Sequence, residues 1–160
     1  MDGGDAKAMF NLGGFYKDGL RGMRRNMAKA VQLWLRAGEL GDARGYCNIG
    51  AAYSNGEGVE REMKKGKYYY ELAAMGGDVI ARHHLGVWEM RTRNMDRAVK
   101  HWMISARAGY DKSLKAIQEC FMNSHATKGG FEKALRAHKE AKDEMKSDQR
   151  EAAAKFYGQI

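Results

Sequence analysis

Residues 4–19 read GDAKAMFNLGGFYKDG, and this stretch recurs as GDARGYCNIGAAYSNG at residues 41–56 and, more loosely, as GDVIARHHLGVWEM at residues 77–90. The copies are 37 and 36 residues apart. A period of this length is typical of architectures built from stacked helix pairs, in which each unit buries its apolar face against its neighbours. The sequence therefore predicts a chain of similar units.

A second segment alternates with the first, as NMAKAVQLWLRAGELG at 26–41, EMKKGKYYYELAAMGG at 62–77, NMDRAVKHWMISARAG at 94–109 and FEKALRAHKEAKDEM at 131–145. Each unit then consists of a helix A, a loop, a helix B and a tight turn. The sequence has 20 glycines and no proline, a balance that suits short helices joined by sharp turns.

We therefore predict an all-α fold, a right-handed α/α superhelix (solenoid) of about four helix-turn-helix repeats followed by a C-terminal capping helix. The chain is expected to be one domain, 1–160. Its predicted parts are repeat 1 at 4–40, repeat 2 at 41–76, repeat 3 at 77–108, repeat 4 at 109–146 and the capping helix at 147–160.

Side chains that suit helix N-caps stand at the expected helix starts. Asn26 and Asn94 precede two B helices. The A helices are expected to begin after Asp5, Asp42, Asp78 and Asp111.

Large and small residues occupy matching places in successive units. In helix A, a large apolar residue precedes a glycine in Leu12-Gly13, Ile49-Gly50 and Leu85-Gly86. In helix B, an aromatic residue stands one turn before a small pair, as in Trp34 with Ala37-Gly38, Tyr70 with Ala73-Ala74 and Trp102 with Ser105-Ala106. We expect each glycine to let helix B of its own unit approach closely.

This pattern resembles the Sel-one-like repeat family, a relative of the tetratricopeptide repeats, over nearly the whole chain. Repeat 2 carries the sharpest match, with Ile49-Gly50, Tyr53, the loop Asn55-Gly56-Glu57-Gly58-Val59 and Ala73-Ala74. The resemblance implies a protein-interaction scaffold that serves as an adaptor within larger assemblies.

The fourth unit departs from the pattern. Gln118 stands where the other units have glycine, and His138 replaces the aromatic residue of helix B. An atypical terminal repeat is expected to act as a cap. We also expect Ala152, Phe156 and Ile160 of the final helix to close the last hydrophobic face.

The residues that carry most enzymatic chemistry form no known motif here. Cys47 and Cys120 suit neither a disulfide framework nor a zinc set, which needs about four ligands at close spacing, and both are expected to be reduced packing residues. The histidines form no metalloprotease motif, and the glycine-rich turns lack the lysine of a phosphate-binding loop. We therefore expect no catalysis, no cofactor and no metal.

No stretch approaches the ~18 apolar residues of a membrane span, and the first residues lack a basic segment followed by an apolar run. The expected location is the cytoplasm. Because Met1 enters directly at a helix A, we also leave open that the chain is part of a longer protein or a larger assembly.

In solenoids of the tetratricopeptide type, helix A lines the concave face. If Leu12, Gly13 and Tyr16 face inward, the opposite stripe of the first helix begins at Lys7 and includes Phe10, Gly14 and Lys17. The same stripe passes through Arg44, Cys47, Ala51 and Ser54, then through Ile80, His83, Val87 and Met90, and then through Lys112, Lys115, Glu119 and Met122. The predicted partner-binding residues in this groove and beside it are Lys7, Phe10, Asn11, Lys17, Arg44, Asn48, His83, His84, Lys112 and Lys115.

The formal net charge of +8 favours an acidic partner over a basic one, whether a nucleic acid, an anionic lipid or an acidic protein surface. The first hypothesis is a protein or peptide held in the groove by these residues. The alternative is a nucleic-acid-binding subunit of a ribonucleoprotein that uses basic side chains on the A-to-B loops, which are Arg21, Arg24 and Arg25, then Arg61, Lys64 and Lys65, then Arg91, Arg93 and Arg97. Loop side chains that are only solvated and bind nothing would give the same sequence pattern.

Overall fold

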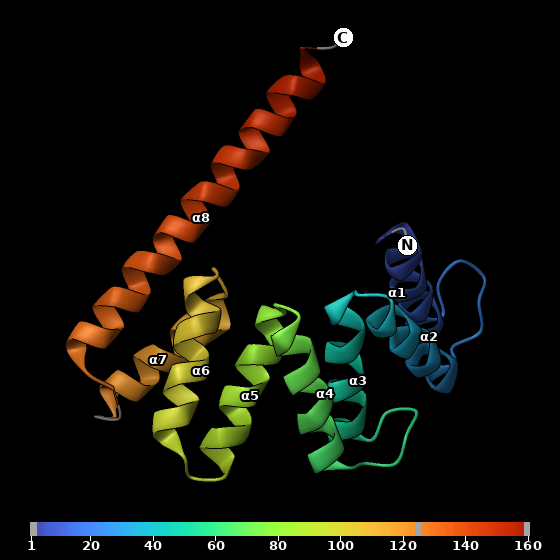
Figure 1. Cartoon of the computed structure of the whole chain (residues 1–160), viewed down its shortest axis with the longest axis horizontal. Coiled ribbons are helices and arrows are strands. Elements are labelled where there is room, and N and C mark those ends of the chain that lie inside the picture. The colour runs from blue at the N-terminus through green and yellow to red at the C-terminus, as the bar shows by residue number, and fades with distance from the viewer. Residues whose placement is uncertain (1–2, 124–125, 159–160) are drawn as a thin grey trace. The chain divides into compact units, whose positions relative to one another are not determined.

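The computed structural model describes residues 3–123 and 126–158, and every regular element in these ranges is an α-helix (Figure 1). The helices are α1 (Gly3–Asp18), α2 (Met27–Glu39), α3 (Ala43–Asn55), α4 (Met63–Met75), α5 (Val79–Arg91), α6 (Met95–Arg107), α7 (Asp111–Met122) and α8 (Lys128–Tyr157). Odd-numbered helices are the predicted A helices and even-numbered ones the B helices. The all-α helical-repeat class is confirmed.

By its internal contacts the chain divides into two compact units, Met1–Trp88 and Glu89–Ile160. The single domain with the repeat bounds given above stays a prediction. The border lies inside α5. In a repeat fold each helix pair contacts only its neighbours, so the chain divides into local groups while the repeat continues along the sequence.

Capping bonds fix several helix starts as predicted. The side chain of Asn26 accepts a hydrogen bond from the Lys29 amide at 3.0 Å, and that of Asp42 accepts one from the Arg44 amide at 3.1 Å. The Ala81 amide donates to Asp78 at 2.7 Å. Asn94 is the N-cap of α6 but makes no capping bond with its side chain.

Two predicted caps are wrong. Asp5 lies in the first turn of α1, because that helix already includes Gly3. Asp111 is the first residue of α7 and follows the N-cap Tyr110. Its carboxylate is engaged instead by His138 of α8, with 2.7 Å between Nε2 and Oδ1.

The glycines of helix A receive the aromatic residue of helix B in the same unit, as expected. A methyl carbon built on Gly13 would lie 2.5 Å from Nε1 of Trp34, and one on Gly50 would lie 2.7 Å from the ring of Tyr70. Trp34 is 2% exposed and Tyr70 is 6% exposed. The pairing of a large residue with a glycine therefore sets the close approach of α1 to α2 and of α3 to α4.

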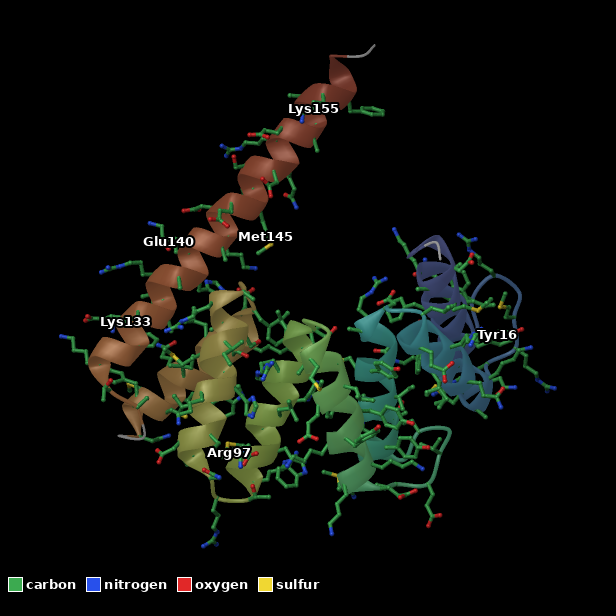
Figure 2. All side chains as sticks on the ribbon, viewed as in Figure 1. Tyr16, Arg97, Lys133, Glu140, Met145 and Lys155 are labelled. Carbon is green, nitrogen blue, oxygen red and sulfur yellow. The ribbon has the colours of Figure 1, made fainter. Side chains whose placement is uncertain are left out.

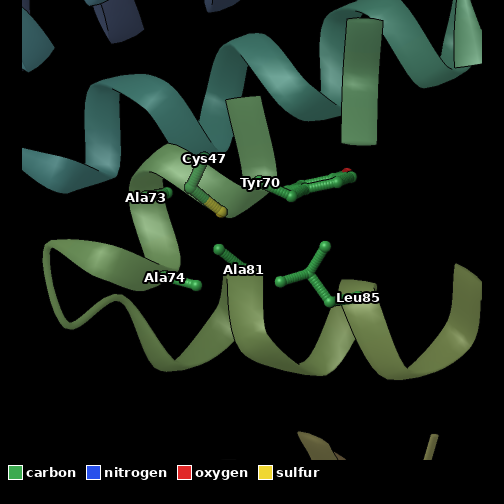
Figure 3. Close-up of a cluster of buried hydrophobic side chains, with 6 residues drawn as sticks. All are labelled: Cys47, Tyr70, Ala73, Ala74, Ala81 and Leu85. Atoms are coloured by element: carbon green, nitrogen blue, oxygen red, sulfur yellow. The ribbon is translucent and has the colours of Figure 1, made fainter. Parts of the chain in front are cut away.

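The core of the first unit contains a cluster that joins one repeat to the next (Figure 3). Cys47 of α3 and Tyr70 of α4 pack against Ala81 and Leu85 of α5. Cys47 is buried, and this burial raises the pKa of its thiol. Cys47 and Cys120 are both free and buried, so the prediction of reduced packing residues is confirmed.

In the second unit, α8 is one continuous helix, whereas the sequence predicted a new helix from Ser147. Its first half packs on α6 and α7: Ala134 is fully buried, and the ring of Phe131 stacks on Phe121 with centroids 5.7 Å apart. Lys133 and Glu140 point away from these helices (Figure 2).

The second half of α8 continues beyond α6 and α7 and is exposed (Figure 1). Phe156 is 64% exposed and Ala152 is exposed as well, so these two residues do not close a hydrophobic face as expected. Ile160 lies outside the described residues. No glycine or proline stands between Gly130 and Gly158 to stop the helix.

Candidate functional site

Eight of the ten predicted partner-binding residues lie in the first unit, on the A helices. Lys7, Asn11 and Lys17 of α1 are exposed, and Phe10 is half-buried. On α3, Arg44 is exposed and Asn48 is half-buried. These two helices supply most of the site.

Arg44 is fixed in place by two neighbours. Its Nε donates to Asp42 Oδ1 at 2.9 Å and its Nη2 donates to Oδ2 at 2.6 Å. Its guanidinium also lies 4.2 Å from the ring centroid of Phe10, so that a cation–π contact joins α3 to α1. The hydrogen bonds from Arg44 hold the pKa of Asp42 below its ordinary value, and Asp42 in turn raises the pKa of Arg44.

A pocket of about 450 Å³ lies beside this ion pair. It is formed by the start of α1 and by the two turns that precede α3 and α5. Its lining comprises Ala6, Lys7, Leu40, Gly41, Asp42, Ala43, Arg44, Gly76, Gly77 and Asp78. Both turns contain a glycine with a left-handed backbone, at Gly41 (φ 100°) and Gly77 (φ 89°).

The pocket brings together two predicted residues, Lys7 and Arg44, with acidic residues that the sequence analysis assigned only to helix caps. Asp42 and Asp78 both line it. The Gly-Asp dipeptide that opens successive repeats could have predicted this arrangement. A turn that recurs in each repeat places its aspartates near one another when the repeats stack.

The predicted stripe is only partly open to solvent. Cys47 stands in its middle and is buried between α3 and α5, and Phe10 lies under Arg44. These positions join successive A helices. A more accessible strip keeps the first residue of the stripe on each helix and then shifts by one position, from Phe10, Cys47 and His83 to their neighbours. We call it the A face and define it by Lys7, Asn11, Arg44, Asn48, Ile80 and His84, of which Asn48 and His84 are half-buried.

The two adjacent histidines of α5 are both half-buried. The ring of His84 stacks on Tyr70 with centroids 4.8 Å apart, and the His83 ring meets the His84 ring edge-on at 5.8 Å. Burial raises the pKa of Tyr70 to about 12, so this phenol stays neutral at physiological pH. The stacked Tyr70 ring covers one face of the His84 ring.

The remaining two predicted residues, Lys112 and Lys115, are on α7 in the second unit. Both side chains are exposed.

The described residues contain no group of three or more His, Cys, Asp or Glu side chains placed to hold a metal ion. Within residues 3–123 and 126–158, no helix combines the length and the apolar character needed to cross a membrane. The A face offers two cations, two side-chain amides, one imidazole and one apolar side chain.

Comparison with curated proteins relates the chain to parts of much longer proteins. It is 34% identical over 99 residues to the ERAD-associated E3 ubiquitin-protein ligase component HRD3B of Arabidopsis thaliana, which covers 61% of this chain and 15% of the relative. It is 42% identical over 55 residues to HRD3A of the same plant, covering 34% of this chain and 8% of that relative. A putative sel1-like repeat-containing protein of Acanthamoeba polyphaga mimivirus is 28% identical over 75 residues, or 47% of this chain and 14% of the viral protein.

Two solved structures share the fold. The Sel1 repeat protein from Oxalobacter formigenes superposes with a TM-score of 0.74 at 23% identity, covering 86% of this chain and 59% of that one. A protective antigen of uropathogenic Escherichia coli with an SLR fold gives 0.73 at 25% identity, covering 86% of this chain and 31% of that one. The Sel1 repeat family model matches residues 6–42 and 43–78. Residues 6–78 therefore match two Sel1 repeats, and the described residues have an all-α helical-repeat fold.

Proposed function

We propose that this protein is a non-catalytic adaptor whose A face holds an acidic, extended peptide segment of a partner protein. The observation that carries the proposal is that α1 and α3 each present a cation and, one turn further on, a side-chain amide. Lys7 forms no hydrogen bond or ion pair with the described residues, and the same is true of the side-chain amides of Asn11 and Asn48. Lys112 and Lys115 offer similar charge in the second unit.

The chemistry of these groups suits a peptide. A side-chain amide both donates and accepts hydrogen bonds, so it matches the N–H and C=O groups of an extended backbone. Lysine and arginine supply the charge that an acidic side chain needs. The Arabidopsis relatives are named as components of a ubiquitin-protein ligase, which fits the role of an adaptor within an assembly.

The basic loop edge supports the nucleic-acid alternative less well. In the first unit, Lys65 lies over the ring of Tyr53 and Arg21 over that of Phe15, at 4.6 and 4.7 Å from the ring centroids. The loop at 56–62 also carries three glutamates, Glu57, Glu60 and Glu62, which weaken the positive potential toward a phosphate backbone.

The test is affinity capture from a native extract with a groove variant and a charge-matched control. The groove variant carries Lys7→Glu, Lys17→Glu and Arg44→Gln. The control carries Arg24→Glu, Lys64→Glu and Arg25→Gln, which change the net charge by the same amount on the loops. Circular dichroism establishes that both are folded, and each capture is run with and without nuclease.

Proteins that are captured by the wild type and the control but lost by the groove variant support the proposal. Identical protein sets from all three forms refute it. Nucleic acid that is retained by the groove variant and lost by the loop variant replaces it with the alternative function.

A further inference from the structure

The second half of α8 extends past the helices on which its first half packs. Met145 lies where the packed part ends: a methyl carbon built on Gly109, in the turn between α6 and α7, would lie 2.7 Å from Cε of Met145. Every residue from Lys146 to Phe156 is exposed. We call residues 145–156 the arm.

The side of α8 that packs in the first half continues along the arm. Positions that alternate three and four residues apart share one face of a helix. His138 marks the packed side, since it contacts Asp111 of α7. The same spacing leads from His138 through Lys142 to four residues that we call the arm seam, Met145, Gln149, Ala152 and Phe156. Met145 is 42% exposed and Phe156 is 64% exposed, and Met145 projects from a different side of α8 than Lys133 and Glu140 (Figure 2).

Two opposite charges lie along one edge of the arm seam. Asp148 directly precedes Gln149 and Lys155 directly precedes Phe156, so the two charges are seven residues apart and share an edge. Neither Asp148 nor Lys155 forms an ion pair with a described residue. This edge therefore carries a negative charge near the start of the arm and a positive charge near its end.

This order of charges is self-complementary when two arms pair antiparallel. About a two-fold axis between Gln149 and Ala152, Met145 of each copy packs against Phe156 of the other, because a symmetric interface makes every contact twice. The edges with Asp148 and Lys155 then face each other, so that the two copies form two Asp148–Lys155 ion pairs.

The alternatives leave these charges without a match. In a parallel pair, each edge meets the opposite edge of the other helix, so Asp148 faces Ala153 and the ion pairs are lost. In the antiparallel pair, the second edge brings Lys146 opposite Ala153, which places no like charges together. Charge complementarity therefore favours a second copy of this chain in the antiparallel orientation.

The packing of α8 on its own unit limits the overlap of the two copies. The arm is about 18 Å long at 1.5 Å per residue. The antiparallel orientation places α6 and α7 of the two copies at opposite ends of the pair. An interface of this length is small, so the dimer is expected to be weak and to form as the protein concentration rises.

We propose that the arm is a self-association surface, through which two copies of this chain pair antiparallel with Asp148 of each opposite Lys155 of the other. This inference goes beyond the adaptor function and does not depend on it. A dimer formed through the arm carries two A faces, which allows bivalent binding of a partner that has two matching segments.

The experiment measures the mass of the whole chain by analytical ultracentrifugation over a range of protein concentrations at low salt. Asp148→Lys and Lys155→Asp each place like charges opposite one another twice and are expected to raise the dissociation constant of the dimer about tenfold. The double variant reverses both partners and is expected to restore the dimer. Glu151→Lys and Arg150→Asp are the charge-matched controls, since these positions lie outside the seam and its edges.

A second pair of variants tests the apolar contact. Phe156→Ser is expected to weaken the dimer, because it removes the aromatic side chain that packs against Met145 of the other copy. Ala154→Ser is the control, since Ala154 is exposed on the arm but belongs neither to the seam nor to its edges. Circular dichroism establishes that each variant keeps the helix content of the wild type.

A wild type that remains monomeric at every concentration overturns the proposal. The antiparallel pairing is also wrong if the single reversals weaken the dimer no more than their controls do, or if the double variant does not restore it. A monomeric wild type that captures another protein, which Phe156→Ser then loses, assigns the arm to that protein and overturns self-association.

Discussion

Replacing Gly13 with alanine is expected to destabilise the first unit, whereas the same change at its neighbour Gly14 is expected to stabilise it. Both residues lie inside α1 and both gain the same helix propensity. They differ in what the added methyl group meets. On Gly13 the methyl would lie 2.5 Å from Nε1 and 2.6 Å from Cδ1 of Trp34, and on Gly14 it would meet nothing within 4 Å.

The magnitude follows from three contributions. Overpacking against a buried side chain costs about 1–3 kcal/mol, and Trp34 has no room to withdraw because it is 2% exposed. A shifted indole also loses its 3.3 Å hydrogen bond to the Phe10 carbonyl, worth about 1 kcal/mol. The gain from replacing a helical glycine is about 1 kcal/mol. The net loss at Gly13 is therefore about 1–3 kcal/mol, against a gain of about 0.5–1 kcal/mol at Gly14.

The assay is urea unfolding at equilibrium, followed by far-ultraviolet circular dichroism and by tryptophan fluorescence. The two probes are compared for each variant, because coincident transitions justify the use of a single free energy of unfolding. The reasoning is refuted if Gly13→Ala raises the urea midpoint as much as Gly14→Ala does. That result would mean that Trp34 moves at little cost and that the glycine does not set the distance between α1 and α2.

Two further predictions concern helix starts and pH. Asn26→Ala is expected to lower the free energy of unfolding by about 1 kcal/mol, because the Asn26 side chain caps α2. Asn94→Ala is expected to lower it less, because the Asn94 side chain makes no capping bond. Equal losses in urea unfolding would contradict this prediction. Since the pKa of Asp42 is lowered in the folded state by the hydrogen bonds from Arg44, its contribution to stability is complete above the unfolded pKa of about 3.9 and is lost as the pH falls through the lower folded value. When the pH is lowered from above to below about 4, the free energy of unfolding should therefore fall less for Asp42→Asn than for the wild type. An unchanged pH dependence would rule out a contribution of this ion pair to stability.

The helices were predictable because the repeats give several copies of the same signal. The pairing of Gly13 with Trp34 and of Gly50 with Tyr70 could be inferred from the alternation of large and small residues alone. The C-terminal helix has only one copy in the sequence, so its bounds could not be checked against a second one. Ser147 suits an N-cap, but it is preceded and followed by good helix formers, and continuing α8 satisfies more backbone hydrogen bonds than restarting it.

The candidate site was less predictable, because an A helix has contacts on several sides. α3 packs against α2, α4 and α5, and this leaves a narrow open strip. Periodicity places Cys47 and Asn48 on adjacent stripes but does not tell which stripe faces the next A helix. In the structure Cys47 is buried against Ala81 and Leu85, so the stripe with Cys47 faces α5 and the stripe with Asn48 is the more open one.

The fourth repeat carries charged residues at positions that are apolar in the second repeat. In repeat 2, the positions that meet α5 are Cys47 and Ala51 on α3 and Ala74 on α4, and all three are apolar. In the register of the repeats, the matching residues of repeat 4 are Lys115, Glu119 and Lys142. Placing a further helix pair on that face would bury three charged groups, which costs several kcal/mol for each one left without a partner. Lys142 instead lies 3.4 Å from Asp111, the carboxylate that also holds His138. Charge at these positions fits the capping role expected of the fourth repeat, and it offers a second explanation for the exposure of Lys115.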